Sequence, residues 1–354
     1  MAAFTTIDNP ELYFQCKLYT GTGSSHAITL DGDENMQPDL VWIKRRNSAG
    51  GHMWTDSIRG VQETIISNET SAEQTFSNGL TAFGSDGFTV GSESGFNGSS
   101  DTFVAWCWKA GSAWSNDASE TSVGSLDTSG TRNTTSKFSI FKYDSSRTPS
   151  ATQTVAHNLG ATPELLIFKN TAESQHWVVW TKDIDTEKHL WFNTDALKTD
   201  SGTFNDTAPS STIVTINGDG RVNSTTDGHT IICYAWDSVQ GFSKFGTYEG
   251  NGNADGPFVY TGFRPAFVIQ KNTGATQGWQ LQDNKRDGFN GANDLLQPHA
   301  NDAESGVNRV DLLSNGFKVI TTDAGQNSDG VEYVYIAFAE APFVNSNGVP
   351  GNAR

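Results

Sequence analysis

The sequence predicts an all-β protein of three tandem, related β-sandwich domains of the jelly-roll or lectin-like type. Short runs of aromatic and β-branched residues, such as residues 40–43 and 333–336, alternate with Gly, Asn and Asp, which is the pattern of sandwiches and barrels. Turn dipeptides such as Asn78-Gly79 and Asp86-Gly87 stand beside strand candidates and favour tight turns. Few stretches of the chain have an apolar period of 3.6, so we expect almost no helix.

A repeated segment divides the chain into three. A proline opens the same apolar run each time and a lysine follows at a constant interval, the pairs being Pro38 with Lys44, Pro163 with Lys169 and Pro265 with Lys271. A tryptophan follows each lysine at a similar interval, at Trp54, Trp177 and Trp279. An Ala-aromatic pair comes later, again at a nearly constant interval, and predicts a closing strand at residues 104–106, 234–236 and 336–338. Since each run is apolar at consecutive positions, we expect a strand buried on both faces.

Further shared pieces support the repeat. Upstream of each proline lie the related segments 17–23, 141–143 and 245–252. Residues 87–90 and 316–319 share the pattern Gly-Phe-x-Val, and residues 220–222 are the expected, weaker counterpart in the second copy. Four features in one order at near-constant spacing indicate a true internal repeat.

The repeat length indicates whole domains. A period of about 100–125 residues exceeds the ~20–50 residues of solenoid or propeller units and fits a full sandwich. We expect sandwich domains at residues 1–112, 137–240 and 241–354, called repeat 1, repeat 2 and repeat 3 below. Residues 113–136, rich in Ser, Thr, Asn and Gly, are predicted to be a flexible linker.

Charge and composition exclude several partners. Lys and Arg number 23 and Asp and Glu number 40, which gives a net charge of −17. Binding to nucleic acid or to anionic membranes depends on basic residues, so we do not expect so acidic a chain to bind either. The apolar runs are far shorter than the ~20 residues of a membrane helix. Three cysteines without CxxC spacing suggest neither a disulfide framework nor a zinc site, and the N-terminus does not have the pattern of a secretory signal.

Catalytic motifs are missing from the sequence. Seven scattered histidines include no HExxH, and there is no GxSxG elbow. The Gly-rich stretches 21–23 and 250–252 precede strands and lack the helix that a phosphate loop needs. The carboxylate pairs Asp183 with Asp185 and Asp283 with Asp287 fall in polar segments and do not recur across the repeats. We therefore expect no catalytic residues, no cofactor, no metal and no enzyme activity.

Two loops could bind a cation. The loop Asn251-Gly-Asn253-Ala-Asp255-Gly256 matches the first half of a calcium-binding loop, but Gly262 stands where the bidentate Glu belongs. The segment 31–36 has the same alternation of oxygen-bearing residues, but Met36 stands where the glycine of the sharp turn belongs. We interpret both as polar turns, with a divalent cation as the open alternative.

Tryptophans are sorted by their place in the repeat. Those at repeat positions are expected in the core: Trp42, Trp106, Trp177, Trp236 and Trp279. Trp114 and Trp191 fall outside the strict repeat, so they are the candidate glycan-binding aromatics, with core packing as the alternative.

Three stretches of the sequence carry a family resemblance. The junction at residues 242–266 contains Gly-Asn-Gly-Asn-Ala-Asp-Gly-Pro-Phe, the N-terminus includes Phe4-Thr-Thr-Ile-Asp-Asn-Pro10, and residues 102–111 read Thr-Phe-Val-Ala-Trp-Cys-Trp-Lys-Ala-Gly. Together they resemble virion structural proteins of marine tailed bacteriophages, the cyanophage and pelagiphage-like group. The segment His157-Asn-Leu-Gly-Ala-Thr-Pro163 is similar to modules of phage tail fibres. The resemblance implies a virion setting and no catalytic residues.

The expected function is therefore a non-enzymatic virion structural protein. A tail-fibre or appendage component that presents loops to the host surface is preferred, because loops on a rigid scaffold carry recognition. The alternatives are a capsid decoration or head-fibre protein and a polysaccharide-binding or depolymerising tailspike module. Expected partners are other virion proteins, further copies of this chain and a host surface glycan or protein. The expected location is the virion, assembled in the host cytoplasm.

Overall fold

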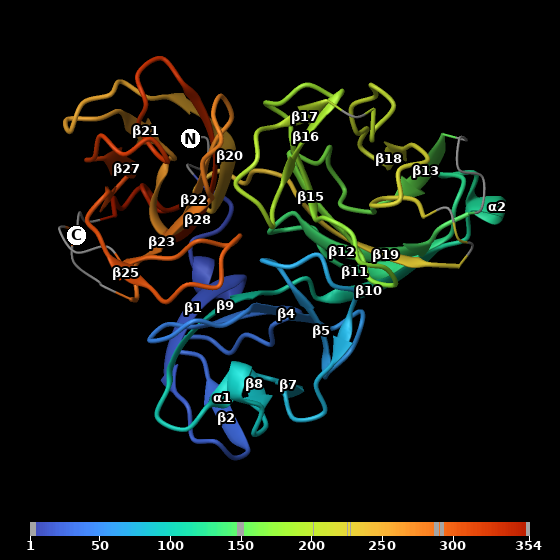
Figure 1. Cartoon of the computed structure of the whole chain (residues 1–354), viewed down its shortest axis with the longest axis horizontal. Helices are drawn as coiled ribbons and strands as arrows, with labels where there is room; N and C mark the ends of the chain where they lie inside the picture. Colours follow the sequence, from blue (N-terminus) through green and yellow to red (C-terminus); the bar gives the residue numbers. More distant parts are fainter. Residues whose placement is uncertain are drawn as a thin grey trace.

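The computed structural model is nearly all antiparallel β-sheet, as predicted. It describes residues 5–351 except 147–151, 201, 225, 227, 287–289 and 291–293. The helices are single turns: η1 (Pro10–Leu12), α1 (Ser94–Asn97) and α2 (Ala118–Thr121). Within these ranges no helix is long and apolar enough to cross a membrane. Figure 1 shows three lobes around a common centre, one for each repeat.

Repeat 1 forms a main sheet and a smaller sheet. The main sheet has six strands, in the order β1 (Phe14–Thr20), β9 (Thr102–Trp108), β3 (Leu40–Arg45), β4 (His52–Asp56), β5 (Glu63–Ile66) and β6 (Gln74–Thr75). The smaller sheet has three, in the order β2 (His26–Thr29), β8 (Gly87–Val90) and β7 (Leu80–Gly84).

Repeat 2 has the same core order with two strands added at one edge. The main sheet runs β10 (Ser112–Asn116), β11 (Thr128–Asn133), β12 (Phe138–Asp144), β19 (Thr230–Trp236), β14 (Leu165–Asn170), β15 (Val178–Thr181), β16 (Lys188–Trp191) and β17 (Thr199–Asp200). The smaller sheet pairs β13 (Gln153–Ala156) with β18 (Ile213–Ile216).

Repeat 3 completes the set. Its main sheet runs β20 (Ser243–Glu249), β28 (Glu332–Pro342), β22 (Phe263–Asn272) and β23 (Gln280–Asp283). A smaller sheet runs β21 (Phe258–Tyr260), β27 (Gly316–Val319) and β26 (Val310–Leu313), and β24 (Asp294–Leu295) pairs with β25 (Ser305–Gly306).

The strand that follows each repeated proline is buried on both faces, as its apolar run predicts. In β3, Val41 and Ile43 enter the core beneath the smaller sheet of repeat 1, whereas Leu40 and Trp42 enter a second core shared by all three repeats. In β22, Val268 likewise faces the core of repeat 3. Because alternate residues point to opposite faces, one apolar strand can join each lobe to the centre.

Strand register corrects one predicted equivalence in repeat 1. Lys169 and Lys271 lie opposite Trp177 and Trp279 by extension of the β14–β15 and β22–β23 pairing. Lys44 instead pairs with His52, so His52, and not Trp54, is the counterpart of those tryptophans. The interval from Pro38 to His52 also equals the interval from each of the other two prolines to its tryptophan.

The closing strands show the same error. Leu40, Leu165 and Phe267 pair with Trp108, Trp236 and Phe338. The counterpart of residues 234–236 is therefore 106–108, not 104–106. A slip by an even number of positions keeps every side chain on its face, so the apolar pattern could not reveal it.

Two other predicted segments differ from the structure. The middle counterpart of β8 and β27 is β18, which pairs with β13 as β8 pairs with β2; residues 220–222 form a turn instead. Residues 113–136 carry β11, α2 and most of β10, and β11 pairs with β12 along most of its length. This segment thus extends a sheet and differs from the flexible linker that its composition predicts.

Three equivalent aromatic rings meet at the centre of the molecule. The centroids of Trp108 and Phe338 are 5.5 Å apart, those of Trp236 and Phe338 6.3 Å, and those of Trp108 and Trp236 6.4 Å, all with edge-to-face geometry. Edge-to-face packing is favourable for aromatic rings. A residual void of about 20 Å³ beside them, lined by apolar side chains, shows how closely the centre is filled.

The repeated lysine joins each lobe to the next. Lys44 Nζ donates to the carbonyl oxygen of Asn301 at 3.2 Å, Lys169 Nζ to that of Thr70 at 3.0 Å, and Lys271 Nζ to that of Asp195 at 3.0 Å. Repeat 1 thereby contacts repeat 3, repeat 2 contacts repeat 1, and repeat 3 contacts repeat 2. All three lysines are fully buried.

The rings opposite these lysines follow the same cyclic order. Trp177 Nε1 donates to the carbonyl of Ile66 at 3.1 Å, and Trp279 Nε1 to that of Trp191 at 2.7 Å. His52, their counterpart, lies against the backbone of Gln297 in repeat 3. The three links close a ring of lobes, in which repeat 1 is held to repeat 3 without a direct chain connection.

Buried ion pairs occur at two of the three junctions. Asp56 bonds Arg59 at 2.6 Å and accepts from Tyr234 of repeat 2 at 2.6 Å. Asp283 bonds Arg286 at 2.6 Å and accepts from Trp106 of repeat 1 at 3.1 Å. At the third junction, between repeats 2 and 3, the equivalent positions hold Thr181, Ile184 and Ile336. These three side chains carry no charge.

The first prediction concerns the buried ion pair between Asp283 and Arg286, which is replaced by the uncharged residues that repeat 2 has at the equivalent positions. Arg286→Met leaves the Asp283 carboxylate buried without its cation, and removing one partner of such a pair costs about 3–5 kcal/mol. The double variant Asp283→Thr, Arg286→Ile reproduces the residues of repeat 2 and should lose less stability than Arg286→Met alone. Guanidinium unfolding at pH 7 measures both; equal or larger loss in the double variant would contradict the equivalence.

The second prediction concerns acid. Burial lowers the pKa of His157, His189 and His299 to about 4. Between pH 4 and 6.5 the unfolded chain therefore binds more protons than the folded chain, and the free energy of unfolding rises with pH. Each histidine contributes at most about 1.4 kcal/mol per pH unit. Urea unfolding from pH 4 to 7 should show this slope, and His157→Gln should reduce it; an unchanged slope would argue against a neutral buried His157.

Candidate functional site

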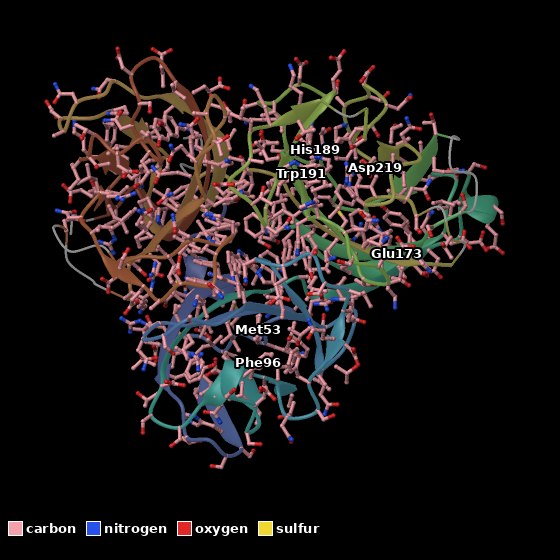
Figure 2. All side chains as sticks on the ribbon, viewed as in Figure 1. Met53, Phe96, Glu173, His189, Trp191 and Asp219 are labelled. Carbon is pink, nitrogen blue, oxygen red and sulfur yellow. The ribbon has the colours of Figure 1, made fainter. Side chains whose placement is uncertain are left out.

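The two predicted glycan-binding tryptophans are both half-buried. Trp114 lies on β10 and packs against the shared core, with its ring 6.3 Å from that of Phe141. Trp191 ends β16, and the Arg221 guanidinium lies 4.5 Å above its ring centroid. The His189 ring also contacts it edge-on at 4.3 Å (Figure 2). A sugar stacking on the Trp191 face beneath Arg221 would have to displace that side chain.

The loop at residues 251–256, interpreted as a polar turn with a cation as the alternative, uses its side-chain oxygen atoms in contacts within the protein. Asn251 Oδ1 accepts from the backbone of Asn253 and from Asn327 Nδ2, at 3.0 and 3.1 Å. Asn253 Oδ1 accepts from the backbone of Asp255 at 3.0 Å, and the Asp255 carboxylate forms an ion pair with Lys318 at 2.6 Å. These are the contacts of a polar turn wrapped around the buried Asn327.

The second candidate loop, residues 31–36, also has an ion pair with a neighbouring strand. Asp31 forms an ion pair with Lys17. Among the residues that the structure describes, no three His, Cys, Asp or Glu side chains gather as a group that could hold a metal ion.

Close backbone approach explains the Gly-rich stretches. A Cβ added to Gly21 would lie 2.0 Å from the carbonyl oxygen of Gly98, and one added to Gly250 would lie 2.2 Å from that of Ser328. Only glycine fits at such contacts. Both glycines therefore allow neighbouring backbone segments to pack closely.

One cluster contains the residue types of a catalytic triad. Ser224 Oγ lies 3.1 Å from His229 Nδ1 and 3.0 Å from Glu173 Oε1, and His229 Nδ1 lies 2.7 Å from the same Glu173 oxygen (Figure 2 labels Glu173). A triad needs the nucleophile and the acid on opposite ring nitrogens. Here both meet Nδ1, so this arrangement does not relay a proton from the hydroxyl to the carboxylate.

The two carboxylate pairs considered from the sequence do not come together as sites among the described residues. Asp185 forms an ion pair with Lys188 at 3.2 Å, and partial burial raises the pKa of the neighbouring Asp183. Asp283 is paired with Arg286, and Asp287 lies outside the described residues.

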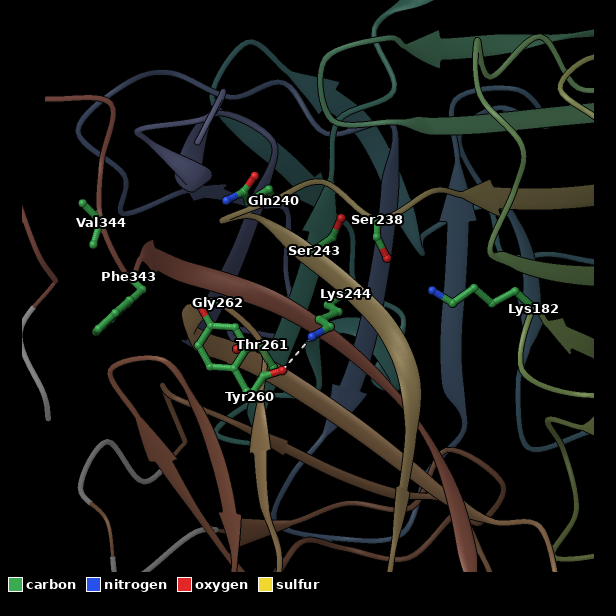
Figure 3. Close-up of a pocket in the computed structure, with 10 residues that line it drawn as sticks. All are labelled: Lys182, Ser238, Gln240, Ser243, Lys244, Tyr260, Thr261, Gly262, Phe343 and Val344. Carbon is green, nitrogen blue, oxygen red and sulfur yellow. Dashed lines mark hydrogen bonds between the residues drawn. The ribbon is translucent and has the colours of Figure 1, made fainter. Parts of the chain in front are cut away.

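A cleft between repeats 2 and 3 is the strongest candidate site (Figure 3). It encloses about 400 Å³, within the range of small-molecule sites. Its polar lining includes Ser238, Gln240, Ser243 and Thr261. Its other lining residues are Lys182, Lys244, Tyr260, Gly262, Phe343 and Val344. Hydroxyl, amide, aromatic and ammonium groups therefore converge at one place.

A substitution within the repeat accompanies this cleft. The first residues of β1, β12 and β20 pair with the three central rings. They are Phe14 and Phe138 in repeats 1 and 2 and Ser243 in repeat 3. A small polar side chain therefore replaces a buried phenyl ring where the cleft lies.

The equivalent place between repeats 1 and 3 is closed. Register places Gln15 and Asn284 at the positions of Lys244 and Lys182. They line a cavity of only about 30 Å³. The cleft thus departs locally from the repeat.

A second cavity of about 630 Å³ adjoins the cleft at Lys182. Glu164 and Asp237 line it. Glu164 forms an ion pair with Lys182 at 2.8 Å and accepts from Ser238. The pKa of Asp237 is raised to about 6, mainly because the carboxyl is partly buried and also because the negative charge of Glu164 is nearby. A carboxyl group with a raised pKa therefore lies beside the cleft.

Comparisons with known proteins place the whole repeated region in one family. A family model described as "Domain of unknown function (DUF7483)" matches residues 9–342. The chain belongs to this family. No curated protein sequence and no solved structure matches it. The family match spans all three repeats, in keeping with the core that they share.

The sequence alone does not predict this cleft. Its residues come from β20, β21 and the segments after β15, β19, β21 and β28, and they form no recognised sequence motif. One usable signal is the Phe, Phe, Ser series at residues 14, 138 and 243, which requires the correct strand alignment.

The third prediction concerns the neighbouring carboxyl groups of Asp237 and Glu164. The Asp237 carboxyl should titrate near pH 6, and Glu164→Gln should lower its pKa by removing a like charge, while burial keeps it above 3.8. Carboxyl ¹³C chemical shifts measure the titration, and Glu249→Gln, at the far end of β20, is the control. Asp237 titrating near pH 4 in the unaltered protein would contradict the geometry.

Proposed function

We propose that this protein is a non-enzymatic structural component of a phage particle, in a tail fibre or appendage that presents loops and the interlobe cleft to the host surface. The observation that carries the proposal is a closed three-lobed body with a polar cleft at one junction, lined by hydroxyl, amide and lysine groups. Resemblance of residues 242–266 to marine phage virion proteins supplies the setting.

The proposal extends to architecture and partners. The three repeats are tandem β-sandwich units of jelly-roll or lectin-like type, each with a main and a smaller sheet. Phage appendages are symmetric assemblies, so further copies of this chain and other virion proteins are the proposed partners. The proposed location is the virion, assembled in the host cytoplasm.

A depolymerising tailspike module is the second candidate. The specific observation in its favour is Asp237, whose raised pKa suits a general acid, beside the carboxylate of Glu164. A capsule-degradation assay decides: Asp237→Asn abolishes activity if this candidate holds, and absence of activity in the unaltered protein supports the recognition role.

The fourth prediction locates the protein. Immunogold labelling of intact phage with an antibody against this chain should mark the tail tip or fibres, and the same antibody should block adsorption to host cells. Gold spread over the head would overturn the fibre assignment in favour of capsid decoration or a head fibre. A positive denatured-particle control with no label on intact phage would also overturn it, because a buried connector cannot touch the host.

A further inference from the structure

Broken repeat symmetry singles out the cleft between repeats 2 and 3. At the other two junctions the equivalent positions hold a buried Asp–Arg pair bonded to the neighbouring lobe. At this junction Thr181 stands at the position of Asp56 and Asp283. Replacement of Phe by Ser243 accompanies an open volume of about 400 Å³. The substitutions that break the repeat pattern therefore occur at the same junction as the open cleft.

An exposed aromatic ring forms one wall of the cleft. Tyr260, the last residue of β21, is 53% exposed. Lys244 Nζ donates to its backbone carbonyl at 2.8 Å and lies over one face of its ring, 5.3 Å from the ring centroid (Figure 3). Large aromatic residues of this chain are otherwise mostly buried, so such a ring beside hydroxyl groups indicates a surface for a partly apolar, partly polar ligand.

The charge of the lining is the second constraint. Lys244 has no carboxylate within ion-pair distance among the described residues, whereas Lys182 is paired with Glu164. One of the three Lys244 donors is used by the Tyr260 carbonyl. In a chain with a net charge of −17, this ammonium group lies at the cleft with donors left for an anionic acceptor. Hydrogen bonds from a charged donor to a carboxylate are stronger than neutral ones.

We propose that this cleft binds an acidic saccharide, a uronate-containing glycan, with the sugar ring on the face of Tyr260 that Lys244 does not cover and its carboxylate at Lys244. The face of a sugar ring presents C–H groups to the tyrosine, and its hydroxyls can bond the exposed amide side chain of Gln240. The hydroxyls of Ser238 and Thr261 already donate to Glu164 and to the Phe263 carbonyl, so toward a ligand they can only accept. The inference rests on the proposed recognition function and names its ligand class. It replaces Trp114 and Trp191 with Tyr260 as the principal sugar-contacting aromatic residue.

The fifth prediction tests binding directly with the full chain. Isothermal titration with trigalacturonate and trimannuronate in 50 mM salt should show saturable 1:1 binding of at least one of them. The neutral galactose trisaccharide of matching linkage should bind about tenfold more weakly, because it lacks the carboxylates. Raising the salt to 500 mM should reduce only the preference for the acidic ligand, since salt screens exposed charges.

Paired variants separate the two contacts. Lys244→Gln should weaken acidic-sugar binding about tenfold and leave neutral-sugar binding unchanged, and Lys244→Arg should restore it. Tyr260→Ala should weaken both about tenfold. Phe258→Ala is the matched control, because Phe258 is 46% exposed on the same strand and does not line the cleft. Unaltered circular dichroism and melting temperature establish that each variant is folded.

The outcomes distinguish this inference from the function on which it rests. No binding of either acidic trisaccharide at millimolar concentration, or equal loss with Phe258→Ala and Tyr260→Ala, overturns the saccharide site even if gold marks the fibres. Saturable binding lost with Tyr260→Ala supports the site, and gold on the head would then overturn only the fibre assignment.

Discussion

The packing of Trp108, Trp236 and Phe338 against one another is the interaction on which the other contacts depend. Each ring belongs to the central strand of a different lobe, and each strand is buried on both faces. Aromatic rings bury large apolar areas and pack with defined angles. Because three edge-to-face contacts must form together, the relative positions of the lobes are set at this point.

Cyclic polar links then surround that centre. The Nζ groups of Lys44, Lys169 and Lys271 donate to backbone carbonyls of a neighbouring lobe, and buried carbonyl groups require such donors. Buried carboxylates demand more of their surroundings, so Asp56 and Asp283 each have an arginine and a donor from the next lobe. The junction without these ion pairs contains the open cleft, so looser packing and a candidate binding surface occur together.

The sequence correctly predicts the strand-rich content and the doubly buried strand after each proline, because these depend on local pattern. It does not predict the pairing of Lys44 with His52, since a slip by an even number of positions preserves every face. The hypothesis that Trp191 binds a glycan rests on its place outside the repeat, but its environment depends on Arg221, which lies on a separate segment of the chain. The cleft is assembled from several separate segments, so no linear motif marks it.

Closure of the ring has a consequence for how the chain is made. Lys44 finds its carbonyl partner at Asn301, 257 residues further along, and Asp8 accepts a hydrogen bond from the backbone of Ser346 at 2.7 Å. At roughly 5–20 residues per second, a ribosome needs on the order of ten seconds or more to supply that partner. During this interval the half of the β3 strand that faces the centre has no neighbour from repeat 3. Nascent repeat 1 thus lacks part of its packing surface until the chain has been elongated through repeat 3.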